Sequence, residues 1–158
     1  MTKFNSLFIL LVSGLIIVGL TDAFAQKKMK KEPVMWAAED IKWVEMKDGP
    51  PGVMVATLWG DMTKGAYGAF VKFSPANTKN PLHTHSSDIK AVVLSGTFTS
   101  GPEGGPEKTY GAGSYLFVPG GWKHTSGAGD AGCTFFMEQS GKFDMKPVEM
   151  KKDEMMKK

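Results

Sequence analysis

The chain has 158 residues, a formal net charge of +3 and a single cysteine, and 42% of its residues are hydrophobic. This length and composition are typical of one globular domain with a real core, and they leave too little chain for two domains. All 19 basic side chains are lysines, and the absence of arginine and of a basic surface rich in aromatic residues argues against nucleic-acid binding. The single cysteine, Cys133, cannot form an intramolecular disulfide, and we expect it to be a small buried hydrophobe in a strand.

Residues 1–25 have the pattern of a secretory signal peptide. Residues 1–3 are short and positive, residues 4–20 are largely apolar, and Ala23-Phe24-Ala25 matches the small-x-small pattern of a cleavage site. A transmembrane anchor needs ~20 mainly apolar residues, whereas polar residues and two glycines interrupt this run. We therefore predict a periplasmic or secreted protein that begins at Gln26 and keeps no stable membrane anchor.

The charges divide the rest of the chain into three parts. Residues 26–32 form a basic N-terminal segment, residues 33–145 form a slightly acidic domain, and residues 146–158 form a charged tail. Short terminal segments of this composition are usually solvated, so we expect the tail to be flexible.

Between these terminal segments the sequence is typical of an all-β protein. Short runs rich in β-branched and aromatic residues alternate with Gly, Pro, Asn and Asp, and no run has helical spacing. The predicted strands are 41–46, 52–59, 66–73, 89–99, 108–110, 114–118, 133–139 and 142–144. The glycine-rich segment 127–132 is predicted to be a turn, and the polar segment 74–81 is predicted to be a rim. Many short strands with frequent turns favour a sandwich or barrel.

The three histidines of the chain are the candidate metal ligands. His83 and His85 are separated by one residue, so in a strand their side chains lie on one face, and His124 could reach the same point from a neighbouring strand. Imidazole nitrogens suit transition metals, and three protein ligands leave open positions for water or substrate. We therefore predict one divalent transition metal, with zinc, iron, manganese, nickel and copper all open. The alternative is that these histidines are solvated in polar loops.

Two motifs resemble those of the cupin superfamily. The first is a glycine, five residues, HxH, three or four residues, a glutamate, six residues and a glycine, and it is matched at His83, His85 and Gly96. The second is a glycine, five residues, PxG, two residues, a histidine and, after three more, an asparagine. It is matched at Gly113, Pro119, Gly121 and His124. The resemblance implies a double-stranded β-helix, the cupin jelly-roll barrel, and a homodimer.

The chain departs from these motifs at three positions. Asn77 replaces the first glycine and Ala128 replaces the asparagine, and neither position is a ligand in the motif. The glutamate position falls on Ile89 or, with the longer spacing, on Lys90, which would bring a positive group to the site. Asp88 becomes a candidate fourth ligand if a β-bulge shifts the register by one residue, and otherwise it is a surface carboxylate.

Small ligands bind in the mouths of such barrels, whose lumen is lined by alternate strand residues. Candidate pocket-lining side chains, each with the alternative of a plain core role, are Lys90, Phe70, Phe117, Trp122 and Trp59.

Two classes of function stay open at this point. The first is a metal-dependent enzyme, resembling oxygenase or lyase cupins, that acts on a small organic compound. The second is a non-catalytic metal-binding, ligand-binding or sensor module. Three neutral imidazoles without a glutamate would leave the metal with its full positive charge, so we expect the small-molecule ligand to be an anion.

Overall fold

The computed structural model describes residues 32–47, 49–74 and 79–149. The predicted signal peptide, nearly all of the basic N-terminal segment and the end of the charged tail lie outside the described residues. The described residues from Trp36 onward belong to one compact unit, and residues 32–35 belong to a separate one. Those four residues are exposed and have no regular secondary structure.

The compact unit is built almost entirely of β-strands, and its described residues include no α-helix. The prediction of an all-β fold is therefore confirmed. The elements are the 3-10 turn η1 (Ala38–Asp40) and the strands β1 (Val44–Glu45), β2 (Val53–Gly60), β3 (Tyr67–Phe73), β4 (Lys79–Thr84), β5 (Ile89–Pro102), β6 (Lys108–Gly111), β7 (Tyr115–Val118), β8 (His124–Gln139) and β9 (Lys146–Pro147). No helix in the described part of the chain is both long and apolar enough to cross a membrane.

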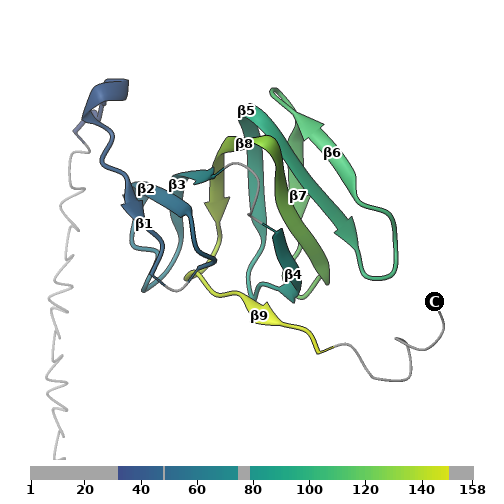
Figure 1. Cartoon of the computed structure of the whole chain (residues 1–158). Helices are drawn as coiled ribbons and strands as arrows, with labels where there is room; N and C mark the ends of the chain where they lie inside the picture. The colour runs from purple at the N-terminus through teal and green to yellow at the C-terminus, as the bar shows by residue number, and fades with distance from the viewer. Residues whose placement is uncertain (1–31, 48, 75–78, 150–158) are drawn as a thin grey trace, which may run out of the picture. The chain divides into compact units, whose positions relative to one another are not determined.

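The long strands β5 and β8 hold the sheet together. They pair antiparallel along most of their length, from Ile89↔Gln139 to Pro102↔His124. The second half of β8 also pairs with β3, and its first half also pairs with β4. Strands β6 and β7 pair with β5, and β9 pairs with β4. Figure 1 shows the resulting curled sheet, with β1 to β3 on one side of β8 and β6 and β7 beyond β5.

The core lies on the inner face of this curl. Residues 70–73 of β3 and 133–139 of β8 alternate between buried and more exposed positions, as the period of two predicts. An aromatic group of Phe73, Phe98 and Phe135 packs with ring centroids 5.2–5.9 Å apart. Cys133 belongs to the same core at 4% exposure, which confirms its predicted role, and burial raises the pKa of its thiol to about 11.

Two parts of the strand pattern differ from the prediction. Strand β4 replaces part of the predicted polar rim, and β8 begins at His124, so the glycine-rich segment 127–132 is strand rather than turn. Pro81 cannot donate to a sheet, and it lies where the β4–β8 register shifts between Asn80 and His83. The small residues in the first half of β8 have no alternating pattern that would predict a strand. This segment is stabilised as a strand because it pairs with β5 on one side and β4 on the other.

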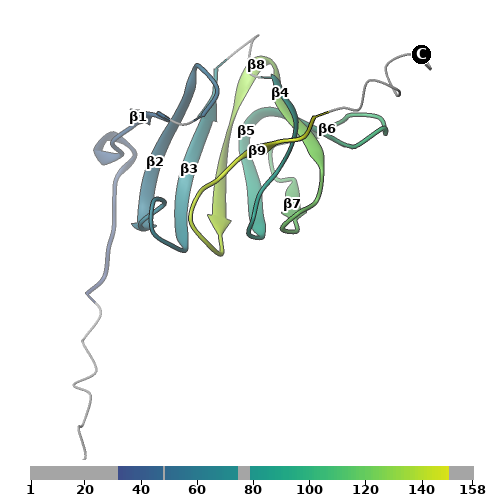
Figure 2. The same ribbon diagram turned by 90° about the horizontal axis from the view of Figure 1, so that it is seen from below.

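The C-terminal boundary also differs from the prediction. Segment 142–144 is not a strand, whereas Lys146 and Pro147, assigned to the flexible tail, form β9. They pair with Thr84 and His83 of β4, and Figure 2 shows β9 crossing beside β4.

Gly96 marks the point where the β5–β8 pair changes register, and it offers a test of this fold. Its φ is +72°, and a Cβ added there would lie 2.1 Å from the carbonyl oxygen of Gly132. Because both the backbone conformation and the contact oppose a side chain, we expect Gly96→Ala to lower the free energy of unfolding by about 2 kcal/mol or more. Gly111→Ala is the matched control, since a Cβ there meets nothing within 4 Å, and its effect should stay within about 0.5 kcal/mol. Equal losses in urea unfolding of the two variants would contradict this register.

Candidate metal centre

The fold brings the three histidines together. His83 lies in β4 and pairs directly with His124 at the start of β8, and His85 follows the end of β4. One ring nitrogen from each histidine lies within 4.8 Å of the others, and the ring centroids are 4.3–5.4 Å apart. All three side chains are buried. The shared strand face and the antiparallel pairing of β4 with β8 thus make the cluster that the sequence predicted.

Two of the rings are oriented by the main chain of their own segments. His83 Nδ1 lies 2.7 Å from the carbonyl oxygen of Pro81, and His124 Nδ1 lies 3.0 Å from that of Trp122. A carbonyl oxygen only accepts hydrogen bonds, so each Nδ1 must carry the proton. In a neutral ring, Nε2 then has a free lone pair, which is the form that ligates a metal.

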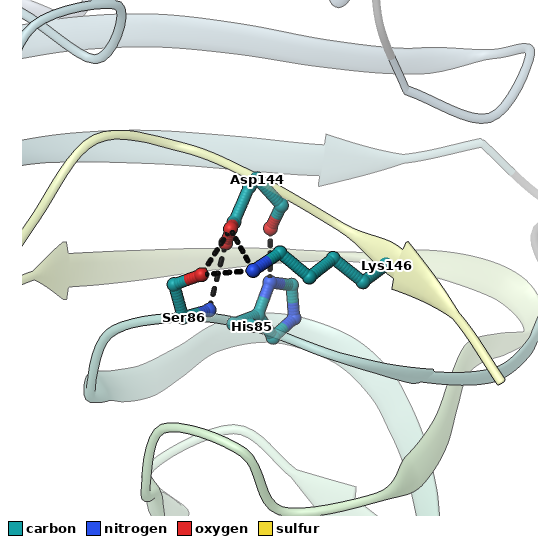
Figure 3. A network of polar contacts seen from close by, with 4 residues as sticks. All are labelled: His85, Ser86, Asp144 and Lys146. Atoms are coloured by element: carbon teal, nitrogen blue, oxygen red, sulfur yellow. Dashed lines mark hydrogen bonds and ion pairs between the residues drawn. The ribbon is translucent and has the colours of Figure 1, made fainter.

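The third ring is oriented by a segment far away in the sequence. His85 Nδ1 donates to the carbonyl oxygen of Asp144 at 2.5 Å. The Asp144 carboxylate in turn accepts hydrogen bonds from the backbone N–H and the hydroxyl of Ser86, at 2.8 and 2.5 Å, and pairs with Lys146 at 3.5 Å. Lys146 also donates to the Ser86 hydroxyl at 2.6 Å. Figure 3 shows this network of Ser86, Asp144 and Lys146 beside His85. The segment that carries β9 is thereby fixed against the candidate site.

Burial keeps the three imidazoles neutral near pH 7. It lowers the pKa of His83, His85 and His124, and for His124 the value falls to about 4. The carbonyl hydrogen bonds act in the opposite direction, and repulsion from His85 lowers the pKa of His83 further. Burial also opposes the charged form of Asp144, but hydrogen bonds from Ser86 and the nearby Lys146 outweigh it and hold that pKa below its ordinary value.

The histidines line a partly open cavity of about 90 Å³. Most of its wall is apolar, with Ile89 and Ala91 of β5 facing inward, and its polar side chains besides the histidines are Asn80, Ser100 and Ser126. Ile89 is the position on which the motif glutamate falls at the shorter spacing. At this site an aliphatic side chain therefore stands where the motif has a carboxylate.

The structure does not bring Asp88 to the histidines. Its side chain is exposed, and one carboxylate oxygen accepts a hydrogen bond from the backbone N–H of Gly120 at 2.8 Å. Asp88 precedes Ile89, the first paired residue of β5, and among the described residues the group of side chains that could hold a metal contains only the three histidines. Asp88 thus tethers the loop after β7 instead of supplying a fourth ligand.

Three of the predicted pocket residues lie away from the cavity. Lys90 and Phe117 are cross-strand partners, and both are exposed because their neighbours Ile89 and Val118 take the inward positions. Trp59 is exposed near the end of β2, with its indole over Gly68 of the neighbouring strand. Strand parity, counted from Ile89, would have placed Lys90 correctly.

The other two predicted pocket residues also do not line the cavity. Phe70 lies on the opposite face of β3 from the core, where it packs against Trp43 and Phe136 with ring centroids 6.5 and 6.1 Å away. Trp122 is partly exposed, but its ring stacks on that of His124 at 5.1 Å with an interplanar angle of 10°. It therefore supports a candidate ligand from outside the cavity.

Sequence reasoning missed two cavity residues near the C-terminus. Phe143 and Met145 line the cavity together with the histidines. Phe143 is also held by a main-chain hydrogen bond to Met62. The sequence predicts 142–144 as a strand and ends the domain at Met145, but no local pattern indicates that these side chains line the cavity, because their position depends on the Asp144 network.

Comparisons with known proteins identify the fold. The solved structures that resemble the chain include the polyketide cyclase RemF from Streptomyces resistomycificus, with a TM-score of 0.63, 20% identity, and coverage of 77% of this chain and 89% of that one. An RmlC-like cupin from Shewanella frigidimarina has a TM-score of 0.54, 18% identity and coverages of 71% and 94%. The DMSP lyase DddQ from Ruegeria pomeroyi has a TM-score of 0.53, 21% identity and coverages of 68% and 60%.

These likenesses show that the fold is that of the cupin superfamily, and the curled sheet is consistent with a jelly-roll barrel. Residues 23–146 match the family described as a domain of unknown function, DUF4437, and the chain belongs to that family. No curated protein sequence matches the chain significantly.

The lowered histidine pKa values predict how the metal-free protein responds to acid. As the pH falls, the histidines of the unfolded chain take up protons near pH ~6.5, whereas those of the folded protein do so only at lower pH. The contribution of the neutral histidines to stability should therefore be fully present above pH ~6.5. It should fall between pH ~6.5 and about 4, the pKa of folded His124. The shift at His124 corresponds to a loss on the order of 3 kcal/mol at most. Urea unfolding of chelator-treated protein measures this slope, and His124→Gln should remove the largest part of it. Stability that stays constant or rises on acidification would contradict the neutral state of the rings.

Proposed function

We propose that this chain is an exported cupin that holds one divalent transition metal on His83, His85 and His124 and binds or transforms a small anionic organic ligand there. The observation that carries the proposal is the convergence of three buried, neutral imidazoles whose Nδ1 protons are all taken by main-chain carbonyls. Export rests on the sequence of residues 1–25, and an N-terminus at Gln26 in the mature protein is its direct test.

The donor set fits a transition metal. Imidazole nitrogens suit zinc, copper, iron and nickel, and outer hydrogen bonds from the ligating rings are the usual device that fixes their orientation. Three protein ligands leave at least one position for water or a substrate oxygen, as in catalytic sites and not in closed structural ones. When bound, the metal would supply a Lewis acid inside a largely apolar cavity.

The surroundings favour an anionic ligand. The inward position next to the histidines is occupied by Ile89, and no Asp or Glu side chain among the described residues lines the cavity. A metal held by three neutral ligands keeps its full charge, and an apolar wall strengthens its attraction for an anion. Small carboxylates and enolates are the matching class of compound.

A non-catalytic binding or sensor module is the second candidate. It is favoured by the absence, among the cavity-lining residues described, of any acid or base besides the three candidate ligands. Oxygenase-like or lyase-like chemistry would then have to rely on the metal and the ligand alone. The named enzymes with this fold, a polyketide cyclase and a DMSP lyase, support only the fold at 20% and 21% identity.

Metal affinity distinguishes residues that bind the metal from nearby residues that do not. We expect His83→Ala, His85→Ala and His124→Ala each to weaken zinc or cobalt binding at least tenfold, since each removes one donor. Asp88→Ala is the control, because its carboxylate is bonded to Gly120, and it should change the affinity less than about twofold. Isothermal titration of chelator-treated protein measures these values. Full affinity in His124→Ala, or a tenfold loss in Asp88→Ala, would reject this ligand set.

The charge of the centre can be changed from two adjacent positions. Ile89→Glu points a carboxylate into the cavity and should tighten cobalt binding while weakening azide and acetate binding to the cobalt-loaded protein, each by about tenfold. Lys90→Glu alters charge at the neighbouring residue but on the exposed face, where solvent screens it, so both affinities should change less than about twofold. Spectroscopic titration with cobalt as the reporter gives both quantities. Similar effects of the two variants would show that the inward position does not set ligand charge.

A further inference from the structure

A row of polar side chains crosses the inner face of the sheet beside the histidines. Asn80 of β4 pairs with Ser126 of β8, and Ser126 pairs with Ser100 of β5. His83 and His124 form the adjacent pair on the same strands. All three members of the polar row are buried and line the same cavity as the histidines. The cavity wall thus carries two neighbouring polar groups, the histidines and the polar row, among otherwise apolar side chains.

The hydrogen bonds of this polar row are incomplete. Asn80 Nδ2 donates to Ser126 Oγ at 2.8 Å, and Ser100 Oγ donates to the carbonyl oxygen of Thr125 at 2.7 Å. Asn80 Oδ1 has no partner among the described residues, although the side chain is only 5% exposed. A buried acceptor without a partner has lost its hydrogen bonds to water and gained none in return, so such an atom needs an explanation.

The other buried atom without a partner in the described chain, Gln139 Nε2, does not line the cavity. Asn80 is therefore distinctive in combining an unpaired polar atom with a place in the wall of the candidate site. Exchanging the amide oxygen and nitrogen would not remove the imbalance. Ser126 would then donate to Oδ1, and Nδ2 would be left unpaired instead.

We propose that the polar row is a second recognition point and that the ligand is a small hydroxycarboxylate. This inference rests on the proposed function, with the carboxylate on the metal, and adds a hydroxyl group bound by Asn80. A hydroxyl both donates and accepts, so it satisfies the amide in either orientation. A second carboxylate could not donate to Oδ1, and with either amide orientation it would bring another negative charge into a largely apolar cavity, which is costly. An ammonium group would be repelled by the metal.

The geometry limits the length of this ligand. Successive residues on one face of a strand are about 6.6 Å apart, so the hydroxyl must stand a few bonds from the carboxylate. The cavity of about 90 Å³ has room for a few water molecules or a ligand of a few heavy atoms. Three-carbon and four-carbon acids with a terminal hydroxyl match both limits.

The test compares hydroxylated acids with their deoxy analogues on the full chain loaded with cobalt. The probes are 3-hydroxypropanoate against propanoate and 4-hydroxybutanoate against butanoate, and affinities come from spectroscopic titration. At least one hydroxy acid should bind tenfold or more tightly than its analogue, because a site built for a hydroxyl penalises its absence. In Asn80→Leu this preference should fall below twofold, while affinities for cobalt and for the deoxy acid stay within threefold of the wild type.

Two further variants keep the test decisive. Thr125→Val changes the residue next to Ser126, but the Thr125 hydroxyl interacts with Glu107 and not with the polar row, so the preference should persist. The double variant Asn80→Leu with Ser126→Ala removes both hydrogen-bonding partners at once. A protein core tolerates this better than the removal of one partner, because no buried polar group is left unpaired. The hydroxyl preference of the double variant should be as low as that of Asn80→Leu.

Three outcomes would overturn the proposal. A hydroxyl preference below twofold in the wild type, or one that survives in both Asn80 variants, would reject the polar row as a recognition point while leaving the metal site intact. Failure of every carboxylate to bind the cobalt-loaded protein would reject the anion-binding function as well.

Discussion

The candidate site depends on three hydrogen bonds from imidazole Nδ1–H groups to main-chain carbonyls. Burial alone would leave the rings free to rotate and to choose either tautomer, and these bonds fix both properties. The acceptors of His83 and His124 lie two residues before each histidine, so local strand geometry sets those rings. The acceptor of His85 belongs to Asp144, so the third ring requires that the C-terminal segment be in place. With Nδ1 bonded to a carbonyl oxygen in each ring, Nε2 is the unprotonated nitrogen that remains, and the three rings lie close enough to share one metal ion.

The C-terminal segment is therefore part of the site and not an appendage to it. Its carboxylate at Asp144 is held by Ser86, the residue next to His85, and by Lys146. Pairing of β9 with β4 adds main-chain bonds to the same segment, and Phe143 and Met145 complete the cavity wall. The exposed charges of this network are individually weak, but they act together with the sheet pairing. Local opening of this segment would remove an acceptor from His85 and part of the cavity wall at once.

The sequence carried enough information to predict the all-β fold and the meeting of the three histidines, because strand parity and the cupin-like spacing both determine them. It did not predict β4, which contains Pro81, or the first half of β8, which consists largely of small residues. Both segments form strands because they pair with neighbouring strands. The pocket predictions failed for a related reason. Phe117 and Trp59 are candidates from their aromatic character alone, without a known register. The inward positions follow from the register of β5 with β7 and β8, in which Ile89 faces inward and Lys90 outward. The tie between His85 and Asp144 spans too much sequence for any local pattern to indicate it.

The proposed ligand follows from charge and hydrogen bonding together. Ile89 supplies no carboxylate to a bound metal, which is why we propose an anionic oxygen on it, and Asn80 has one buried polar atom without a partner, which is why we propose a hydroxyl group there. All of this presupposes the neutral Nδ1–H form of the three rings. Long-range proton–nitrogen NMR correlation of the histidine side chains, in metal-free protein near neutral pH, tests that form most directly. We expect three rings protonated at Nδ1 and unprotonated at Nε2. Doubly protonated rings, or an Nε2–H tautomer at any of the three histidines, would contradict it.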